Sequence, residues 1–197
     1  MGIYCIGIDN GLFGAVVVID DSFSLVDWWD TPLINLGKKG KDKNEFAPAA
    51  MGDIIRGIIH KYCPNINDNR HVFAYIEQAH AMPEQGLTST FKTGRGYGLW
   101  EGILVGSGIS YDVVHAKTWT KVMLHDMPLG EPKGRSMAKC QRLYPRLPLI
   151  KPHGRKLSMD GRSDAALIAT YGMMQHTGAT HARANTQTRR PPARKPT

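Results

Sequence analysis

The chain has 197 residues, of which 42% are hydrophobic, and it carries a formal net charge of +8. This length and apolar content suit one globular domain rather than a disordered chain, and no apolar run reaches the roughly 20 residues that a membrane helix needs. The three cysteines, Cys5, Cys63 and Cys140, are scattered without a paired spacing, which disfavours a zinc or disulfide framework and favours a reducing compartment.

Apolar runs rich in β-branched residues, bounded by turn residues, predict five strands. They cover residues 3–9, 13–20, 24–29, 72–77 and 110–114. The first three strands follow one another through short connections, which favours antiparallel pairing among them. Residues 31–44 contain proline, glycine and four lysines, and we expect them to form a loop.

Apolar residues at helical spacing predict the helices. They cover residues 48–62, 88–104, 117–124, 133–143 and 163–174. The helix over 88–104 contains several glycines, each of which costs about 1 kcal/mol relative to alanine. We therefore expect Gly94, Gly96 and Gly98 to permit a close contact, either with the sheet or with a second copy of the chain.

The order of these elements predicts an α/β fold, with a mixed five-stranded sheet flanked by helices and its first three strands antiparallel. From His176 onward the chain is rich in Arg, Pro, Thr and Ala and has no Phe, Tyr or Trp. We expect one domain over residues 1–176, followed by a basic disordered tail over residues 177–197.

Four acidic residues draw attention to chemistry. Asp9 and Glu77 each stand at the carboxyl end of a predicted strand, where ligand sites form in open α/β sheets. Asp160 and Asp164 are four residues apart, which places them on one face of a helix start. Four acids in one crevice repel one another unless a hard divalent cation such as Mg²⁺ is bound. Two such ions about 4 Å apart can activate a water and stabilise the leaving oxygen of a phosphoryl displacement.

Each acid also has a simpler interpretation. Asp9 precedes Asn-Gly and fits a turn, Glu77 fits a solvated strand end, and Asp160 fits a helix cap. Asp164 is harder to explain in this way, because it precedes the apolar run Ala-Ala-Leu-Ile-Ala and an isolated buried carboxylate is costly. Either a metal ion or an ion pair with Arg162 would satisfy it.

Basic residues are concentrated between His115 and Lys156, where ten Lys and Arg residues face only Asp126 and Glu131. The predicted tail adds further arginines without any acid. Concentrated positive charge favours a polyanionic partner, although a solvated basic surface would have the same composition. The candidate phosphate contacts are Lys117, Lys121, Lys133, Arg135, Lys139, Lys156 and Arg162. Trp119, within this segment, fits a core residue better than a base-stacking platform.

Three segments together resemble the acidic motifs of RuvC-like Holliday-junction resolvases. They are Ile6-Gly-Ile-Asp9-Asn-Gly11, Tyr75-Ile-Glu77-Gln78 and Asp160-Gly-Arg-Ser-Asp164-Ala-Ala-Leu-Ile-Ala. The resemblance covers residues 3–175, and the four-residue spacing of the last motif is closer to phage and plant-organelle members. Asp9, Glu77 and Asp164 match the family's acidic metal ligands, whereas Asp160 matches less closely because of that spacing.

The resemblance implies a ribonuclease-H-like fold and a homodimer. Its expected activity is that of a structure-selective endodeoxyribonuclease, a hydrolase that uses two Mg²⁺ ions, or Mn²⁺, to make paired symmetric nicks in four-way DNA junctions. This implies a role in DNA recombination or repair inside the cell, with the bacterial cytoplasm, a phage origin and an organelle all left open. Met82 and Phe91, near the loop after Glu77, are candidate wedges that enter the junction, with ordinary packing as the alternative.

Other functions remain to be separated from this one. A related nuclease acting on flaps, forks or other branched nucleic acid would need the same four acids. A non-catalytic DNA-binding protein would need only the basic residues. An ATPase of the sugar-kinase or actin type also begins with a strand ending in Asp, but it needs two such domains, and one opening motif in 197 residues does not supply them.

Overall fold

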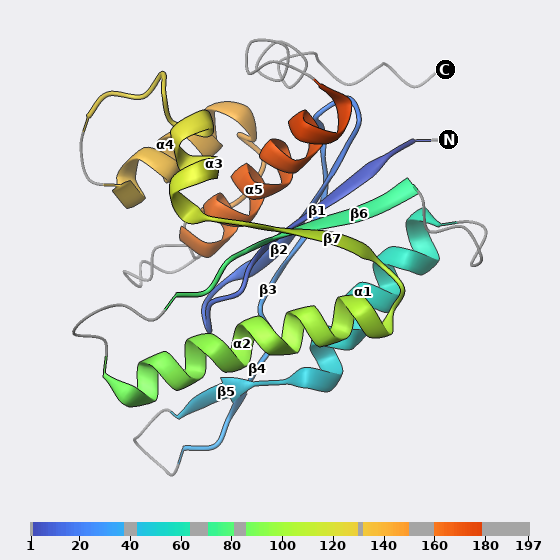
Figure 1. Ribbon diagram of the computed structural model, residues 1–197, viewed down its shortest axis with the longest axis vertical. Coiled ribbons are helices and arrows are strands. Elements are labelled where there is room, and N and C mark those ends of the chain that lie inside the picture. The colour runs from blue at the N-terminus through green and yellow to red at the C-terminus, as the bar shows by residue number, and fades with distance from the viewer. Residues whose placement is uncertain are drawn as a thin grey trace.

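The central feature of the computed structural model is a mixed five-stranded sheet in the order β3-β2-β1-β6-β7 (Figure 1). The strands are β1 (Tyr4–Asp9), β2 (Ala15–Asp20), β3 (Leu25–Asp30), β6 (Val72–Glu77) and β7 (Ser110–Val114). The structure describes residues 2–37, 43–63, 71–80, 86–129, 132–149 and 160–178. The predicted tail lies outside these ranges except for its first two residues, of which Thr177 ends the last helix.

Strand direction brings the predicted acids to one edge of the sheet. Strands β1, β2 and β3 are antiparallel, as predicted, whereas β6 runs parallel to β1 and β7 parallel to β6. Ile8 pairs with Ile76, so β1 and β6 end side by side. Asp9 and Glu77 are the last residues of these two strands, and they therefore share the carboxyl edge.

Helices cover both faces of the sheet (Figure 1). They are α1 (Pro48–Tyr62), α2 (Leu87–Gly106), α3 (Ala116–Met123), α4 (Pro132–Leu143) and α5 (Asp160–Thr177). Successive residues of a strand point to opposite faces. Accordingly, Ile6 and Ile8 pack in the core with α1 and α2, whereas Cys5 packs in the core with α3, α4 and α5. No helix within the described ranges combines the length and the apolar character that crossing a membrane requires.

Helix α5 lies directly against β1 because Gly7 has no side chain. A Cβ atom at Gly7 would lie 2.0 Å from the carbonyl oxygen of Ala165 and 2.4 Å from the amide nitrogen of Ala169. Thirteen of the 18 residues of α5 are buried, which agrees with the apolar run in its sequence. The predicted start at residue 163 was three residues late, because Asp160 already forms the first turn of the helix.

The segment 31–44 was expected to be a loop, and this prediction was wrong. Strands β4 (Leu33–Asn35) and β5 (Asn44–Phe46) form a separate two-stranded antiparallel sheet. Three-residue strands are too short to show an alternating pattern, and the lysines between them hid the pairing. Phe46 at the end of β5 is buried, and it packs with α1 and α2 in the core.

The glycines of α2 serve two different purposes. A Cβ atom at Gly96 would lie 2.5 Å from the carbonyl oxygen of Asn10 and equally close to the ring of Phe46, so this glycine allows α2 to approach the body of the protein. A Cβ atom at Gly94 or Gly98 would meet nothing within 4 Å. The close contact expected of this helix is therefore made with the domain at Gly96, while the other two glycines face open space.

We expect Gly7→Ala to lower the free energy of unfolding by about 1–3 kcal/mol or more, because the added methyl group would meet backbone atoms that cannot rotate away. Urea denaturation measures the change. Gly57→Ala on α1 is the matched control. Its Cβ would meet nothing, and removing a glycine from a helix stabilises the protein by up to about 1 kcal/mol. Equal effects of the two changes would contradict the proposed α5–β1 contact.

Candidate active site

Asp9 ends β1 and begins the turn that leads to β2. The amide of Gly11 donates a hydrogen bond to Oδ1 of Asp9 over 3.0 Å, which is the turn geometry that the sequence allowed. The other carboxylate oxygen faces the start of α5, since a Cβ atom at Gly161 would lie 3.0 Å from Oδ2 of Asp9. Asp9 therefore belongs to the turn and also lies beside the first turn of α5.

Glu77 is held by two contacts that the sequence did not reveal. The indole Nε1 of Trp119 donates a hydrogen bond to Oε2 of Glu77 over 2.7 Å, and the side-chain amide of Asn10 donates to the Glu77 carbonyl oxygen. Trp119 is buried, as predicted, and its polar atom is directed at this carboxylate. Burial raises the pKa of the Glu77 carboxyl, and the hydrogen bond from Trp119 opposes that rise.

Asp164 occupies the most unfavourable position of the four acids. Burial, together with the negative charges of Asp9, Glu77 and Asp160, raises the pKa of its carboxyl to about 8, although a hydrogen bond from Ser136 opposes the rise. Its Oδ1 atom is buried and has no hydrogen-bond partner among the described residues. The repulsion means that the four acids lie close enough to one another to interact.

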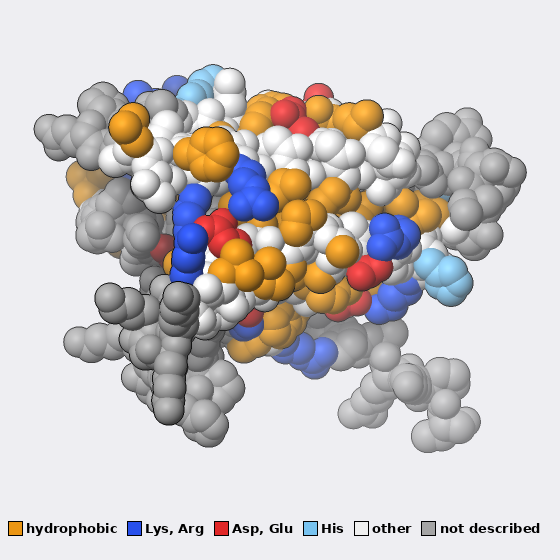
Figure 2. Space-filling model, turned by 90° about the horizontal axis from the view of Figure 1, so that it is seen from below, with side chains coloured by type: hydrophobic (Ala, Val, Ile, Leu, Met, Phe, Trp, Pro, Cys, Tyr) orange, Lys and Arg blue, Asp and Glu red, His pale blue; other side chains and the backbone are white. Residues whose placement is uncertain are grey.

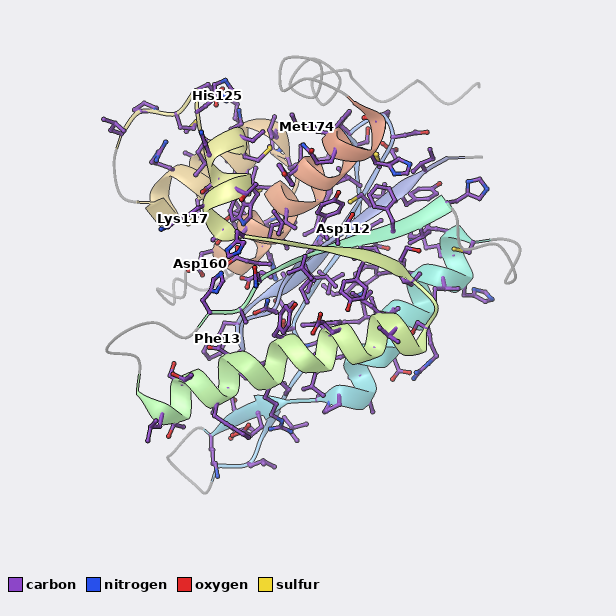
Figure 3. The ribbon with its side chains drawn as sticks, viewed as in Figure 1. Phe13, Asp112, Lys117, His125, Asp160 and Met174 are labelled. Carbon is purple, nitrogen blue, oxygen red and sulfur yellow. The ribbon has the colours of Figure 1, made fainter. Side chains whose placement is uncertain are left out.

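Asp160 stands at the first position of α5, with its backbone oxygen accepting a hydrogen bond from the Ser163 hydroxyl. A carboxylate in the first turn of a helix also interacts favourably with the helix dipole. This position is compatible with both earlier interpretations of Asp160, as a helix cap and as a member of the acidic group. In the view of Figure 3, Asp160 is drawn between Lys117 and Phe13.

The donor set fits a hard divalent cation. It consists of carboxylate oxygens, which Mg²⁺ and Mn²⁺ prefer, and it includes the buried, unpartnered oxygen of Asp164. As the side chains stand, no three Asp, Glu, His or Cys residues in the described ranges converge closely enough to hold one ion. Binding would therefore require rotation of the carboxylates toward a common point.

The predicted phosphate contacts differ in how far the structure leaves them exposed. Lys117 and Lys121 are exposed on α3, and Arg135 is half-buried on α4. In contrast, Lys139 is fully buried and donates to both carboxylate oxygens of Asp126 over 2.9 Å. Lys156 and the side chain of Lys133 lie outside the part of the chain that the structure describes.

Arg162 has a structural role instead of the predicted one. Its guanidinium donates to both oxygens of Asp30, over 2.5 and 2.7 Å, and to the carbonyl oxygen of Pro148. It also stacks on the ring of Trp28, and the residue is only 9% exposed. Arg162 is therefore neither the partner of Asp164 nor accessible in the way that a phosphate contact requires.

One of the two wedge candidates can be placed. Phe91 is 71% exposed on the first turns of α2, and Leu87 beside it is 91% exposed. Packing within the domain thus does not explain Phe91. Met82 lies outside the described residues.

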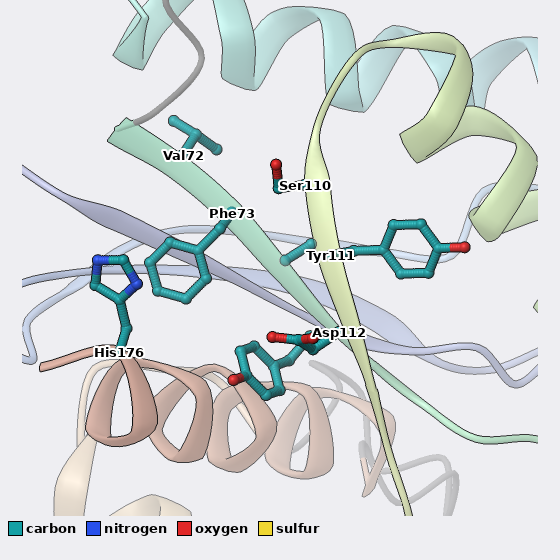
Figure 4. A pocket seen from close by; sticks show the side chains of 8 residues that line it. Val72, Phe73, Ser110, Tyr111, Asp112 and His176 are labelled. Atoms are coloured by element: carbon teal, nitrogen blue, oxygen red, sulfur yellow. The ribbon is translucent and has the colours of Figure 1, made fainter. Parts of the chain in front are cut away.

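A cavity lies apart from the four acids. It has a volume of about 340 Å³ and lies beside the amino ends of β6 and β7, opposite the carboxyl edge (Figure 4). The ring of His176 stacks on Phe73 at its rim, with 4.4 Å between ring centroids. Among the described residues that line it, Asp112 is the one acid, and it lies in the middle of β7 and not at a strand end.

Without a bound cation, we expect the free energy of unfolding to fall as pH rises. The folded pKa of Asp164 is about 8 and the unfolded value is about 3.9, so between them the folded state keeps a proton that the unfolded state has lost. Urea denaturation in EDTA at about pH 5 and about pH 8 measures the slope. Asp164→Asn should flatten it, whereas an unchanged slope would contradict the buried position of this carboxyl.

Comparison with solved structures agrees with this architecture. The chain is similar to a structure of Thermus thermophilus RuvC in complex with a Holliday-junction substrate, with a TM-score of 0.59, 10% sequence identity, and coverage of 89% of this chain and 96% of that one. A second Thermus thermophilus RuvC structure gives a TM-score of 0.52, 12% identity, and coverage of 89% and 97%. No family model and no curated protein matches the sequence. At these identities the likeness shows a shared fold, and the chain has the ribonuclease-H-like fold of RuvC.

Proposed function

We propose that this protein is a metal-dependent endonuclease that cuts branched DNA, with the four-way junction as its substrate. The observation that carries the proposal is the gathering of Asp9, Glu77, Asp160 and Asp164 at one edge of the sheet, where their charges raise the pKa of Asp164. The solved structure of RuvC with a Holliday junction, which shares this fold, supports the choice of substrate.

In the proposed reaction, two Mg²⁺ or Mn²⁺ ions held by the four acids would supply activation of a water and neutralisation of charge on the phosphate. Hydrolysis breaks the bond between phosphorus and the 3′ oxygen and leaves a 5′-phosphate. Trp119 donates a 2.7 Å hydrogen bond to one carboxylate oxygen of Glu77 and so limits the directions that this carboxylate can take. Gly161 leaves room for the Asp9 carboxylate beside α5, so that a larger side chain there would displace it.

The proposal includes a homodimer, because paired nicks across a junction need two sites. The exposed face of α2 is our candidate interface. Gly94 and Gly98 face open space, and the large apolar side chains of Leu87, Phe91 and Val105 are exposed on the same helix. Figure 2, which views the molecule from the side of α2 and β5, shows apolar side chains spread across this face. Small residues allow two helix backbones to approach closely, and the apolar side chains would be buried in the contact.

We place the protein inside the cell, in a reducing compartment, because all three cysteines are buried and no disulfide joins them in the described part of the chain. The four-residue spacing of Asp160 and Asp164 makes phage and plant-organelle resolvases the nearest analogues in this proposal.

We expect Asp9→Asn to abolish cleavage of a synthetic four-way junction in Mg²⁺ while leaving junction binding nearly unchanged. The change removes one charged ligand oxygen from the site and no basic residue. Gel assays of cutting and binding measure the two effects, with flap, fork and linear duplex substrates as comparisons. Asp53→Asn, an exposed aspartate on α1, is the control and should cut normally. Retained cleavage by Asp9→Asn would remove this residue from the mechanism.

We expect the wild-type protein to sediment as a dimer and Gly98→Arg to sediment as a monomer of 21.8 kDa. A long charged side chain at this position would keep two α2 helices apart. Gly57→Arg on α1 also adds an arginine where a Cβ meets nothing, and it should remain dimeric. A monomeric wild type, or a dimeric Gly98→Arg protein, would show that this face is not the interface.

A further inference from the structure

Two histidines meet at the carboxyl edge of the sheet, and the proposed reaction uses neither of them. His80 comes three residues after the end of β6, and His115 directly follows β7. The two rings stack with 4.5 Å between their centroids, and a hydrogen bond of 2.8 Å joins Nε2 of His80 to Nδ1 of His115. Both residues are exposed, so a ligand can reach the pair from solvent.

The backbone around the pair keeps the two rings near one another. The amide of Gln78 donates to the carbonyl oxygen of Val114 over 2.8 Å, which continues the pairing of β6 and β7 to the residues just before the histidines. The carbonyl oxygen of His115 accepts a hydrogen bond from the amide of Thr118 at the start of α3. Because both histidines lie within two residues of hydrogen-bonded backbone, a ligand that binds both rings has little chain to order.

The spacing of the two facing nitrogen atoms suits one metal ion. Imidazole nitrogens bind Zn²⁺ at about 2.0–2.1 Å, so two of them on a tetrahedral ion lie about 3.3 Å apart. A small rotation of the exposed rings takes the present separation of 2.8 Å to this value. The proton in the hydrogen bond would move to the other nitrogen of its ring, which leaves a lone pair on each of the two facing atoms.

We propose that His80 and His115 together bind one divalent transition-metal ion, represented by Zn²⁺, at a site separate from the four acids. Imidazole suits Zn²⁺, whereas Mg²⁺ prefers the carboxylate oxygens of the acidic group. No third His, Cys, Asp or Glu of the described ranges is near enough to complete the site, so water would fill the remaining positions. Binding would therefore be weaker and more readily reversed than at a structural zinc site with four protein ligands.

The place of the pair connects it with the acidic edge. His80 lies three residues after Glu77, and the amide of Trp119, whose indole donates to Glu77, donates to the carbonyl oxygen of His115 over 3.3 Å. A dication at this place repels other cations that approach the acids. Bound Zn²⁺ should therefore raise the Mg²⁺ concentration that cleavage requires. This regulatory effect rests on the proposed nuclease function, whereas the binding of Zn²⁺ does not.

The first experiment titrates Zn²⁺ into the full chain in excess Mg²⁺ and follows the imidazole C–H signals by NMR. We expect saturable binding that shifts the signals of His80 and His115 together. His80→Asn and His115→Asn should each weaken this binding by about tenfold or more, whereas His60→Asn, which removes an exposed histidine of α1, should not. No saturable shift of the two signals, or unchanged affinity in either pair variant, would overturn the site.

The second experiment measures junction cleavage against Mg²⁺ concentration, with and without enough Zn²⁺ to saturate the pair. In the wild type, we expect Zn²⁺ to raise the half-maximal Mg²⁺ concentration several-fold, and in His115→Asn to leave it unchanged. An unaffected wild type, or equal inhibition of His115→Asn, which would place the inhibiting ion at the acids, overturns the regulatory effect. A protein that passes the first experiment and cuts no DNA would keep the metal site and lose only the proposed nuclease function.

Discussion

Helix α5 rests on β1 across Gly7, and the composition of the acidic site depends on this contact. Because a Cβ at Gly7 would overlap the backbone at Ala165, the helix axis can pass close to the strand only when glycine is present. Gly161 repeats the arrangement within the first turn of α5, where it lies against the Asp9 carboxylate. Two positions without side chains thus place acids that are about 150 residues apart in the sequence at the same edge of the sheet.

Without a bound cation, the four acids lower the stability of the folded chain. Asp164 is held beside other carboxylates in a buried place, and its pKa of about 8 expresses both burial and repulsion. Trp119 reduces the cost of burying the Glu77 carboxylate by donating a hydrogen bond to it. Oδ1 of Asp164 has no such donor in the described structure. Proteins retain arrangements of this kind where function requires them, since perturbed acids cluster at catalytic and metal sites. A bound divalent cation would attract all of these carboxylates. Its binding would therefore restore the stability that their mutual repulsion removes.

The sequence predicted the strand ends and the antiparallel pairing of the first three strands, because apolar runs rich in β-branched residues, turn residues and short connections are local signals. Asp9 and Glu77 were found in this way. The partners of long side chains were not predictable, since Arg162 bonds Asp30 and Lys139 bonds Asp126 only after distant elements have packed. The burial of Trp119 could be predicted because tryptophan is a large apolar residue. The acceptor of its indole N–H could not be predicted, because it depends on where β6 places Glu77. The different roles of Gly94 and Gly96 also became clear only from what each glycine faces.

Helix α3 holds Glu77 through its buried Trp119 and carries Lys117 and Lys121 on its exposed face. The central claim, however, concerns the acids: that they bind divalent cations together. The most direct test is anomalous diffraction from crystals soaked in Mn²⁺. We expect strong peaks bounded by Asp9, Glu77 and Asp164, with Asp160 at or next to the site. Peaks elsewhere on the surface, or none at this edge of the sheet, would contradict the claim.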